Sequence, residues 1–141
     1  MREILFRGKR MDNGEWVDGS LLKVTINGKT AHLIFGDNFA FVGGDVKALS
    51  HALVGPSTVG QYTGLTANGK KIFEGDIIKI PDDYNEFGHN AGEIYEVYFC
   101  CGGFRLKPKY TKARGYWLED DETVEVIGNI HDNPELLEVK P

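Results

Sequence analysis

Residues 59–80 read VGQYTGLTANGKKIFEGDIIKI and carry the clearest structural signal in the chain. Residues 59–65 predict a β-strand, and the extended run Ile72-Phe73 predicts its return. Between them stands Asn68-Gly69, a dipeptide typical of two-residue hairpins, because a type I′ turn needs positive φ at both central positions. Residues 77–80 hold three isoleucines, end before a proline and predict a buried strand. The stretch therefore predicts a succession of short antiparallel strands.

Two further Asn-Gly pairs extend this pattern toward the N-terminus. Residues 3–8 predict a first strand, Asn13-Gly14 a two-residue turn and residues 16–26 a second strand. Asn27-Gly28 turns the chain again before a third strand at residues 31–35, which completes a β-meander. Apolar and polar residues alternate in the second strand, which is the period of a half-buried strand with one face toward the core. That face carries Leu22, Val24 and Ile26.

The C-terminal half contains a second group of strand signals. Residues 93–101 predict a strong strand, Gly102-Gly103 a hairpin turn and residues 104–106 the return strand. Residues 123–130 predict the last strand, with Val124, Val126 and Ile130 facing inward. The core face of the first of these strands is expected to carry Tyr95, Val97, Phe99 and Cys101.

Three segments have other expectations. Residues 45–53 fit either a short helix or another strand, and both alternatives stay open. Residues 81–92 predict a long polar loop, a class that is often functional or mobile. Residues 133–137 predict one helical turn with Asn133 as N-cap and Pro134 at the first helical position.

Composition bounds the class of protein. The 141 residues fit two small modules, 1–58 and 59–141, or one continuous globular unit. The 18 glycines favour many tight turns, and the formal charge of −5 weighs against non-specific nucleic-acid binding. Cys100 and Cys101 are adjacent and make no secreted disulfide framework, and the N-terminus lacks the apolar core of a signal peptide. We therefore expect a cytoplasmic protein without a membrane segment.

The sequence offers little catalytic or metal-binding chemistry. Its histidines have no ligand spacing, and His32 is expected to face solvent. Cys101 is expected to pack as a small hydrophobe, because a catalytic thiol needs a histidine brought near by the fold. Phosphate-loop and dinucleotide motifs are missing, so we expect no cofactor, no metal and no enzyme activity. The histidines are His32, His51, His89 and His131.

Residues 107–117 are the one segment with functional character. Basic residues alternate there with aromatic ones, a combination that grips single-stranded nucleic acid by charge and by base stacking. The acidic run 119–122 follows at once and would partly cancel the positive field. The speculative contact residues are Lys107, Lys109, Tyr110, Lys112, Arg114 and Trp117.

Residues 61–78 are similar to the signature of the YopX protein family, which is found in phages and prophages. The N-terminus, residues 1–7, and the C-terminal run 126–137 resemble that family as well, whereas residues 8–58 and 81–122 contribute little. The resemblance implies a mainly β protein with an SH3-like β-barrel in its second half, made in a bacterial host cell. It brings no catalytic or binding residues to carry over.

The signature also has a physical interpretation of its own. Gly64 and Gly75 flank the hairpin at positions where positive φ or close strand approach would exclude a β-carbon. Asp76 can accept backbone N–H groups in the turn before the buried strand. His131 stands where the family usually carries tyrosine, so it receives no functional weight.

These observations favour a non-enzymatic phage accessory protein that binds a protein partner or associates into a homo-oligomer. The alternative is a module that binds single-stranded nucleic acid through residues 107–117. A small hydrolase with a site around Cys101 or His89 ranks last.

Overall fold

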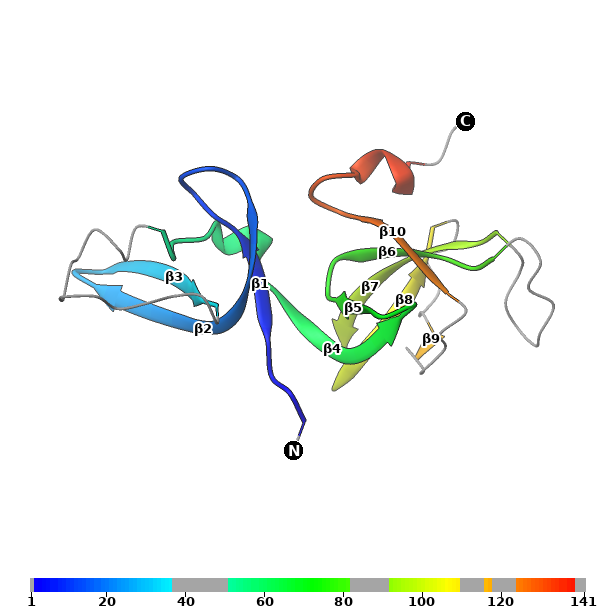
Figure 1. Cartoon of the computed structure of the whole chain (residues 1–141), viewed down its shortest axis with the longest axis horizontal. Coiled ribbons are helices and arrows are strands. Elements are labelled where there is room, and N and C mark those ends of the chain that lie inside the picture. Colours follow the sequence, from blue (N-terminus) through cyan, green and yellow to red (C-terminus); the bar gives the residue numbers. More distant parts are fainter. Residues whose placement is uncertain (1, 37–50, 82–91, 110–115, 118–123, 139–141) are drawn as a thin grey trace. The chain divides into compact units, whose positions relative to one another are not determined.

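A computed structural model describes residues 2–36, 51–81, 92–109, 116–117 and 124–138 (Figure 1). The chain forms two compact units, Met1–Tyr62 and Thr63–Pro141. The expected boundary after residue 58 lies just before strand β4 (Gly60–Ala67), which runs through the division between the two units.

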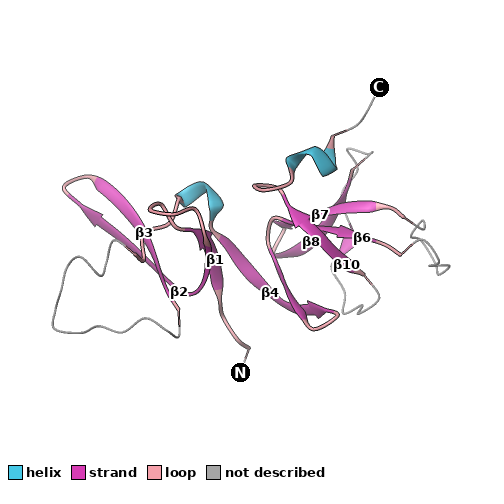
Figure 2. Cartoon of the chain, turned by 45° about the horizontal axis from the view of Figure 1, so that its top comes forward, coloured by secondary structure: helices cyan, strands magenta, loops and turns pink. Residues whose placement is uncertain are grey.

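The described secondary structure is β apart from two 3-10 turns (Figure 2). The described strands pair in two sheets, ordered β3-β2-β1-β4-β5 and β10-β6-β7-β8-β9. The prediction of a mainly β, antiparallel protein is confirmed. No pairing among the described strands closes either sheet into a barrel. The elements besides β4 are β1 (Phe6–Lys9), β2 (Trp16–Ile26), β3 (Lys29–Phe35), η1 (Pro56–Thr58), β5 (Lys70–Phe73), β6 (Asp76–Lys79), β7 (Ile94–Cys100), β8 (Gly103–Pro108), β9 (Tyr116–Trp117), β10 (Glu125–Asn129) and η2 (Pro134–Leu137).

The described part of the chain contains no helix with the length and hydropathy that a membrane span requires.

Two of the three Asn-Gly pairs form the predicted two-residue turns. Asn27-Gly28 joins β2 to β3 and Asn68-Gly69 joins β4 to β5, and in each pair φ is 51° at Asn and 75° at Gly. The same prediction for Asn13-Gly14 is wrong. The loop there is longer, because the Arg10 amide donates to the Glu15 carbonyl at 2.9 Å and the residues between them bulge out.

The first unit is an antiparallel meander whose middle strand, β2, is longer than its pairing with β1. That pairing ends at Gly19, whereas β3 accompanies β2 as far as Ile26. Ile34 and Val54 are 2% and 1% exposed, and a β-carbon on Gly8 would lie 3.0 Å from the Val54 Cβ. Leu22 lies beyond the β1 pairing and is 48% exposed, so its predicted burial is wrong.

The second unit has one core that gathers residues from many strands. Ile77 and Ile78 are both 0% exposed, as predicted for a buried strand. A bulge between Val126 and Gly128 shifts the pairing of β10 with β6. Val126 packs against this core, whose buried members are Ala67, Ile72, Ile78, Ile80, Tyr95, Val97, Leu106 and Val124.

The remaining segments are described only in part. Of residues 45–53, the described end is a turn that leads to an isolated bridge between Leu53 and Leu33. The interior of the expected loop 81–92 lies outside the described residues. The helical turn at 133–137 is present as η2, but Asn133 makes no side-chain cap. Asn133 holds the N-cap position and Pro134 follows at the start of the turn, as predicted. The Asn133 Oδ1 accepts the Asn129 amide at 3.3 Å rather than an amide of the turn.

Candidate functional site

The structure describes half of the predicted nucleic-acid contacts. Lys107 is exposed on β8 and stands opposite Glu96 of β7. Lys109 is half-buried, and its amide donates to the Ile94 carbonyl at 3.0 Å. Trp117 lies on β9, which pairs with β8, but its partner on β8 is Arg105 rather than Lys107. The other predicted contacts lie outside the described residues; they are Tyr110, Lys112 and Arg114.

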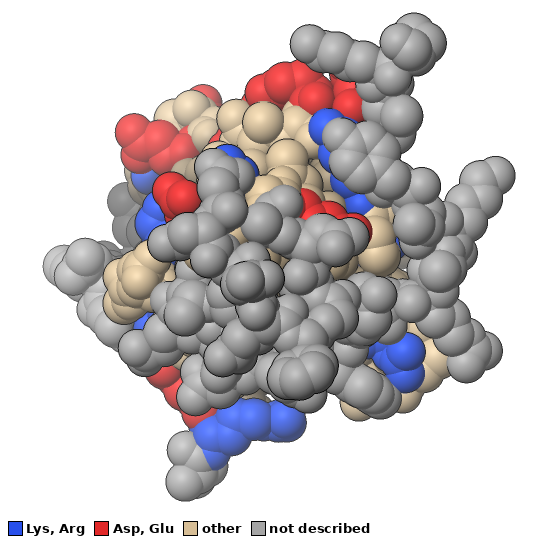
Figure 3. All heavy atoms as spheres, turned by 90° about the vertical axis from the view of Figure 1, so that its right-hand side faces the viewer, with Lys and Arg blue, Asp and Glu red and all other residues tan. Residues whose placement is uncertain are grey.

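Sequence analysis missed a cross-strand pair on the same hairpin. Tyr98 of β7 stands directly opposite Arg105 of β8. Directly opposed residues of an antiparallel pair share a face of the sheet. The alternation of residues along β7 could have revealed Tyr98, because it places Tyr98 on the opposite face from the buried Tyr95 and Val97. On the face drawn in Figure 3, the described basic and acidic side chains occupy small separate groups.

The turn of the β7–β8 hairpin lies one residue earlier than expected. Its two central residues are Cys101 and Gly102, with φ of 57° and 85°, and β8 already begins at Gly103. The left-handed conformation takes Cys101 out of the strand alternation, so its side chain is exposed. The predicted packing of Cys101 in the core is therefore wrong. Its Sγ lies 3.0 Å from the Sγ of the half-buried Cys100.

The core face of β7 continues past the core to this tip. Tyr95 and Val97 are 0% exposed, but Phe99, the next residue on that face, is 54% exposed. Its predicted burial is wrong, because the buried cluster ends before the hairpin does. Phe99 packs edge to face on Phe104 of β8, with ring centroids 5.3 Å apart. The hairpin therefore presents an aromatic pair beyond the core.

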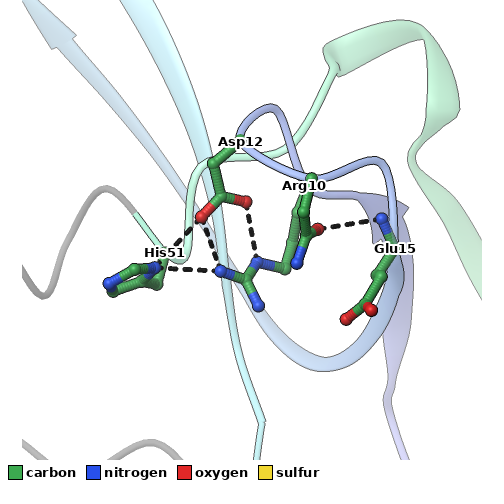
Figure 4. Close-up of polar contacts among 5 residues, drawn as sticks. Arg10, Asp12, Glu15 and His51 are labelled. Atoms are coloured by element: carbon green, nitrogen blue, oxygen red, sulfur yellow. Dashed lines mark hydrogen bonds and ion pairs between the residues drawn. The ribbon is translucent and has the colours of Figure 1, made fainter.

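A polar cluster in the first unit joins the 11–14 loop to the segment before Val54 (Figure 4). Arg10 Nε lies 2.9 Å from Asp12 Oδ1, and Arg10 Nη2 lies 2.5 Å from Asp12 Oδ2. His51 Nδ1 lies 3.0 Å from Asp12 Oδ2 and 2.9 Å from Arg10 Nη2. The hydrogen bond from Arg10 is the main cause that lowers the pKa of Asp12 below its usual value.

The geometry of this cluster gives the His51 Nδ1 two alternative hydrogen-bond partners. A guanidinium only donates and a carboxylate only accepts, so Nδ1 of His51 serves one neighbour at a time. When Nδ1 carries hydrogen, it donates to Asp12, and the His51 ring is then oriented by the carboxylate. The cluster is exposed and connects two loops. Sequence analysis missed it because 39 positions separate Asp12 from His51.

The other histidines are dispersed. His32 is half-buried on β3, and its Nδ1 is shielded from solvent with no hydrogen-bond partner among the described residues, so the prediction that it faces solvent is wrong. The His131 amide donates to Asn129 Oδ1 at 3.0 Å. His89 lies outside the described residues. Where the structure is described, no three His, Cys, Asp or Glu side chains group closely enough to hold a metal ion.

The signature glycines have the predicted positive φ. Gly64 and Gly75 have φ of 88° and 91°, a region that a β-carbon disfavours. Asp76 is 2% exposed, and its Oδ2 accepts the Phe73 amide at 2.8 Å. Asn129 pairs opposite Asp76 in the β6–β10 register, so the central and C-terminal motifs meet in one place.

The family comparison agrees with this arrangement. A family model described as YopX protein matches residues 5–138. The chain belongs to the YopX protein family. It is 35% identical over 80 residues to the SPbeta prophage-derived uncharacterized protein YopX of Bacillus subtilis (strain 168). That match covers 53% of this chain and 56% of the relative, so it spans about half the length of the YopX relative.

A solved structure extends the likeness of the fold to the whole chain. The crystal structure of protein EF1440 from Enterococcus faecalis matches with a TM-score of 0.52 and 22% sequence identity. The match covers 98% of this chain and 100% of that chain. At this identity the likeness concerns the fold alone.

Proposed function

We propose that this YopX family protein is a non-enzymatic binding module that associates with copies of itself through the β7–β8 hairpin. The setting we propose is the cytoplasm of a bacterial cell that carries a phage or prophage. Support for the setting comes from the Bacillus subtilis relative, whose name marks that protein as prophage-derived.

The exposed Phe99, which packs on the half-buried Phe104, carries the proposal. Large aromatic side chains that are exposed beside an apolar surface are typical anchors of protein interfaces. Phe99 is 54% exposed although Val97, two residues earlier on the same face, is 0% exposed. A second copy would cover Phe99 with the same face of its own hairpin, as two-fold symmetric interfaces do.

The charge of the hairpin favours a second copy as the occupant. The chain carries a formal charge of −5, and identical acidic surfaces repel each other. Residues 94–108 hold one acidic residue, Glu96, and two basic residues, Arg105 and Lys107. This hairpin is therefore a part of the chain that two copies can bring together without that repulsion.

Self-association is measured by size-exclusion chromatography with light scattering over a range of protein concentrations. We expect the mass of the wild type to rise above that of one chain as concentration rises, and the Phe99→Thr variant to stay monomeric. The matched control is Leu22→Thr, an exposed leucine on β2 that should associate like the wild type. A wild type that stays monomeric, or a Phe99→Thr variant that associates normally, contradicts the proposal.

The finer fold prediction, an SH3-like barrel within residues 59–141, also belongs to the proposal. Its support is that β4, β5, β6, β7 and β8 contribute buried residues to one core, against which Val126 of β10 packs. Strands of two sheets that share one core are the arrangement from which small barrels close. A crystal structure in which the first and last strands of this region do not pair would contradict it.

A second candidate function is binding of single-stranded nucleic acid by the other face of β7 and β8. The observation that favours it is the cross-strand pair of Tyr98 and Arg105, with the exposed Lys107 on the same strand as Arg105. We expect salt-dependent binding of fluorescent oligonucleotides that is lost in a Lys107/Lys109/Arg114 triple alanine variant. No binding at low salt would exclude this candidate.

A further inference from the structure

Two thiols lie side by side at the tip of the β7–β8 hairpin, and neither the proposed association nor the YopX signature uses them. Cys100 is the last residue of β7 and pairs with Gly103, and Cys101 is the first of the two turn residues. Their Sγ atoms are 3.0 Å apart, and the two residues form no disulfide. A disulfide bond is about 2.05 Å long, so the two sulfurs need to approach each other by about 1 Å to form one.

The backbone at Cys101 departs from the residue preference of this turn type. The first central residue of a type I′ turn is usually Asn, Asp or Gly, because these residues tolerate positive φ. The two other turns of this kind have Asn27 and Asn68 there, each with φ of 51°. Cys101 takes the same conformation, with φ of 57°. A strained backbone that holds a reactive side chain is a feature of functional sites.

A disulfide between neighbouring residues suits a transient role rather than a structural one. Adjacent Cα atoms are about 3.8 Å apart across a trans peptide bond, whereas disulfides usually have a Cα separation of about 4.4–6.8 Å. Strained or exposed disulfides are easily reduced, and they are the ones that serve regulation or catalysis. In reducing compartments the disulfides that do form are usually of this transient class.

We propose that Cys100 and Cys101 form a reversible redox site, at which a small-molecule disulfide oxidises the two thiols to an intramolecular disulfide. The Cys101 thiolate attacks one sulfur of the small disulfide, so that a mixed disulfide forms and one small thiolate leaves. The Cys100 thiolate then attacks the Cys101 sulfur, which closes the ring and releases the second small thiolate. Two electrons pass to the small disulfide, and the two protons of the pair end on the two thiols that it yields.

The exposure of the two cysteines assigns these roles. Cys101 is exposed and meets the small disulfide first, whereas the half-buried Cys100 lies behind it and resolves the mixed disulfide. A β-carbon added to Gly102 would meet no atom within 4 Å, so the tip is open on that side as well.

The charge of the hairpin fits an anionic oxidant such as oxidised glutathione. Residues 94–108 hold one acidic residue, Glu96, and two basic residues, Arg105 and Lys107, although the whole chain carries a formal charge of −5. An anion therefore meets less repulsion at this hairpin than the net charge of the chain suggests.

The site is tested by incubating the full chain in buffers with defined ratios of oxidised to reduced glutathione. Remaining thiols are alkylated with N-ethylmaleimide, and the chain is weighed by mass spectrometry before and after digestion. We expect the wild type to lose two hydrogen atoms and both alkylation sites within one chain, and to regain them in excess reduced glutathione. The reaction is run at protein concentrations at which the chain is monomeric, so its outcome is independent of self-association.

Two variants separate the roles of the thiols. Cys100→Ser removes the resolving thiol, so we expect this variant to stop as a mixed disulfide between Cys101 and glutathione, which does not accumulate in the wild type. Cys101→Asn supplies the residue type that suits the turn and leaves only the half-buried thiol, so we expect little reaction. Far-UV circular dichroism should be unchanged in both variants.

Repeating the wild-type reaction in urea that unfolds the chain measures the contribution of the fold. We expect the mixed disulfide to build up in urea, because the turn no longer holds the two sulfurs near each other. The proposal is overturned if the native wild type resists oxidised glutathione, remains a mixed disulfide or links two chains. It is also overturned if the ring closes equally well in urea.

Discussion

Removal of the Asp76 carboxylate is expected to cost the second unit a large part of its stability. Asp76 and Phe73 are 2% and 6% exposed, and the carboxylate oxygen lies 2.8 Å from the Phe73 amide nitrogen. In Asp76→Ala that amide loses its acceptor in a buried position, which costs about 1–3 kcal/mol. Asp76→Asn keeps an oxygen acceptor but removes the charge, so we expect a loss of about 1 kcal/mol.

Urea unfolding of the full chain, followed by far-UV circular dichroism, gives the free energy of unfolding of each variant. Because two units need not unfold together, hydrogen exchange of the Phe73 amide is measured in parallel. We expect the loss of protection to follow the order wild type, Asp76→Asn, Asp76→Ala. An Asp76→Ala variant within about 0.5 kcal/mol of the wild type would refute the structural role of the carboxylate, since that is the range of neutral surface changes.

Three further predictions concern single positions. Gly128→Ala should lower stability by about 1–3 kcal/mol in thermal unfolding, because its β-carbon would lie 2.4 Å from Asn133 Oδ1; an unchanged midpoint would show that Asn133 moves aside without cost. Cys101→Asn should raise stability by up to about 1 kcal/mol through relief of the positive φ, and a lower midpoint would contradict this. The pKa of the Asp12 carboxyl, measured by NMR, should lie below 3.8 and should rise in Arg10→Gln. The stabilisation that Asp12 gives is present above 3.8 and is lost as pH falls through the lowered pKa. An unchanged Asp12 pKa in the variant would be evidence against the contact.

The sequence predicted turns well where the backbone conformation depends on the residue types of the turn itself. Asn27-Gly28 and Asn68-Gly69 form type I′ turns because this turn needs positive φ at both central residues, which Asn and Gly tolerate. Asn13-Gly14 failed because the Arg10–Glu15 pairing encloses a longer loop, and pairing between strands is not a property of the dipeptide.

Burial was predicted less well, since it depends on where a core ends. Tyr95 and Val97 are buried and Phe99 is not, although the three share one strand face and one alternation. Leu22 is likewise exposed, because β2 extends past Gly19, where its pairing with β1 ends. Periodicity gives the face of a strand but not the length over which another layer covers it.

The candidate sites show the same division between local and long-range information. Cys100 and Cys101 are neighbours in the sequence, but their closeness in space depends on the turn being one residue earlier than Gly102-Gly103 predicts. The contact of Asp12 with His51 has no sequence signal at all, because it depends on the tertiary fold.

Concentration-dependent NMR of the wild-type chain tests the association of the β7–β8 hairpin most directly. Backbone amide shifts are compared between dilute and concentrated samples, residue by residue. We predict that the changes cluster at residues 97–106, around Phe99, and vanish in Phe99→Thr. Shift changes confined to the first unit, or spectra that do not change with concentration, would contradict self-association through this hairpin.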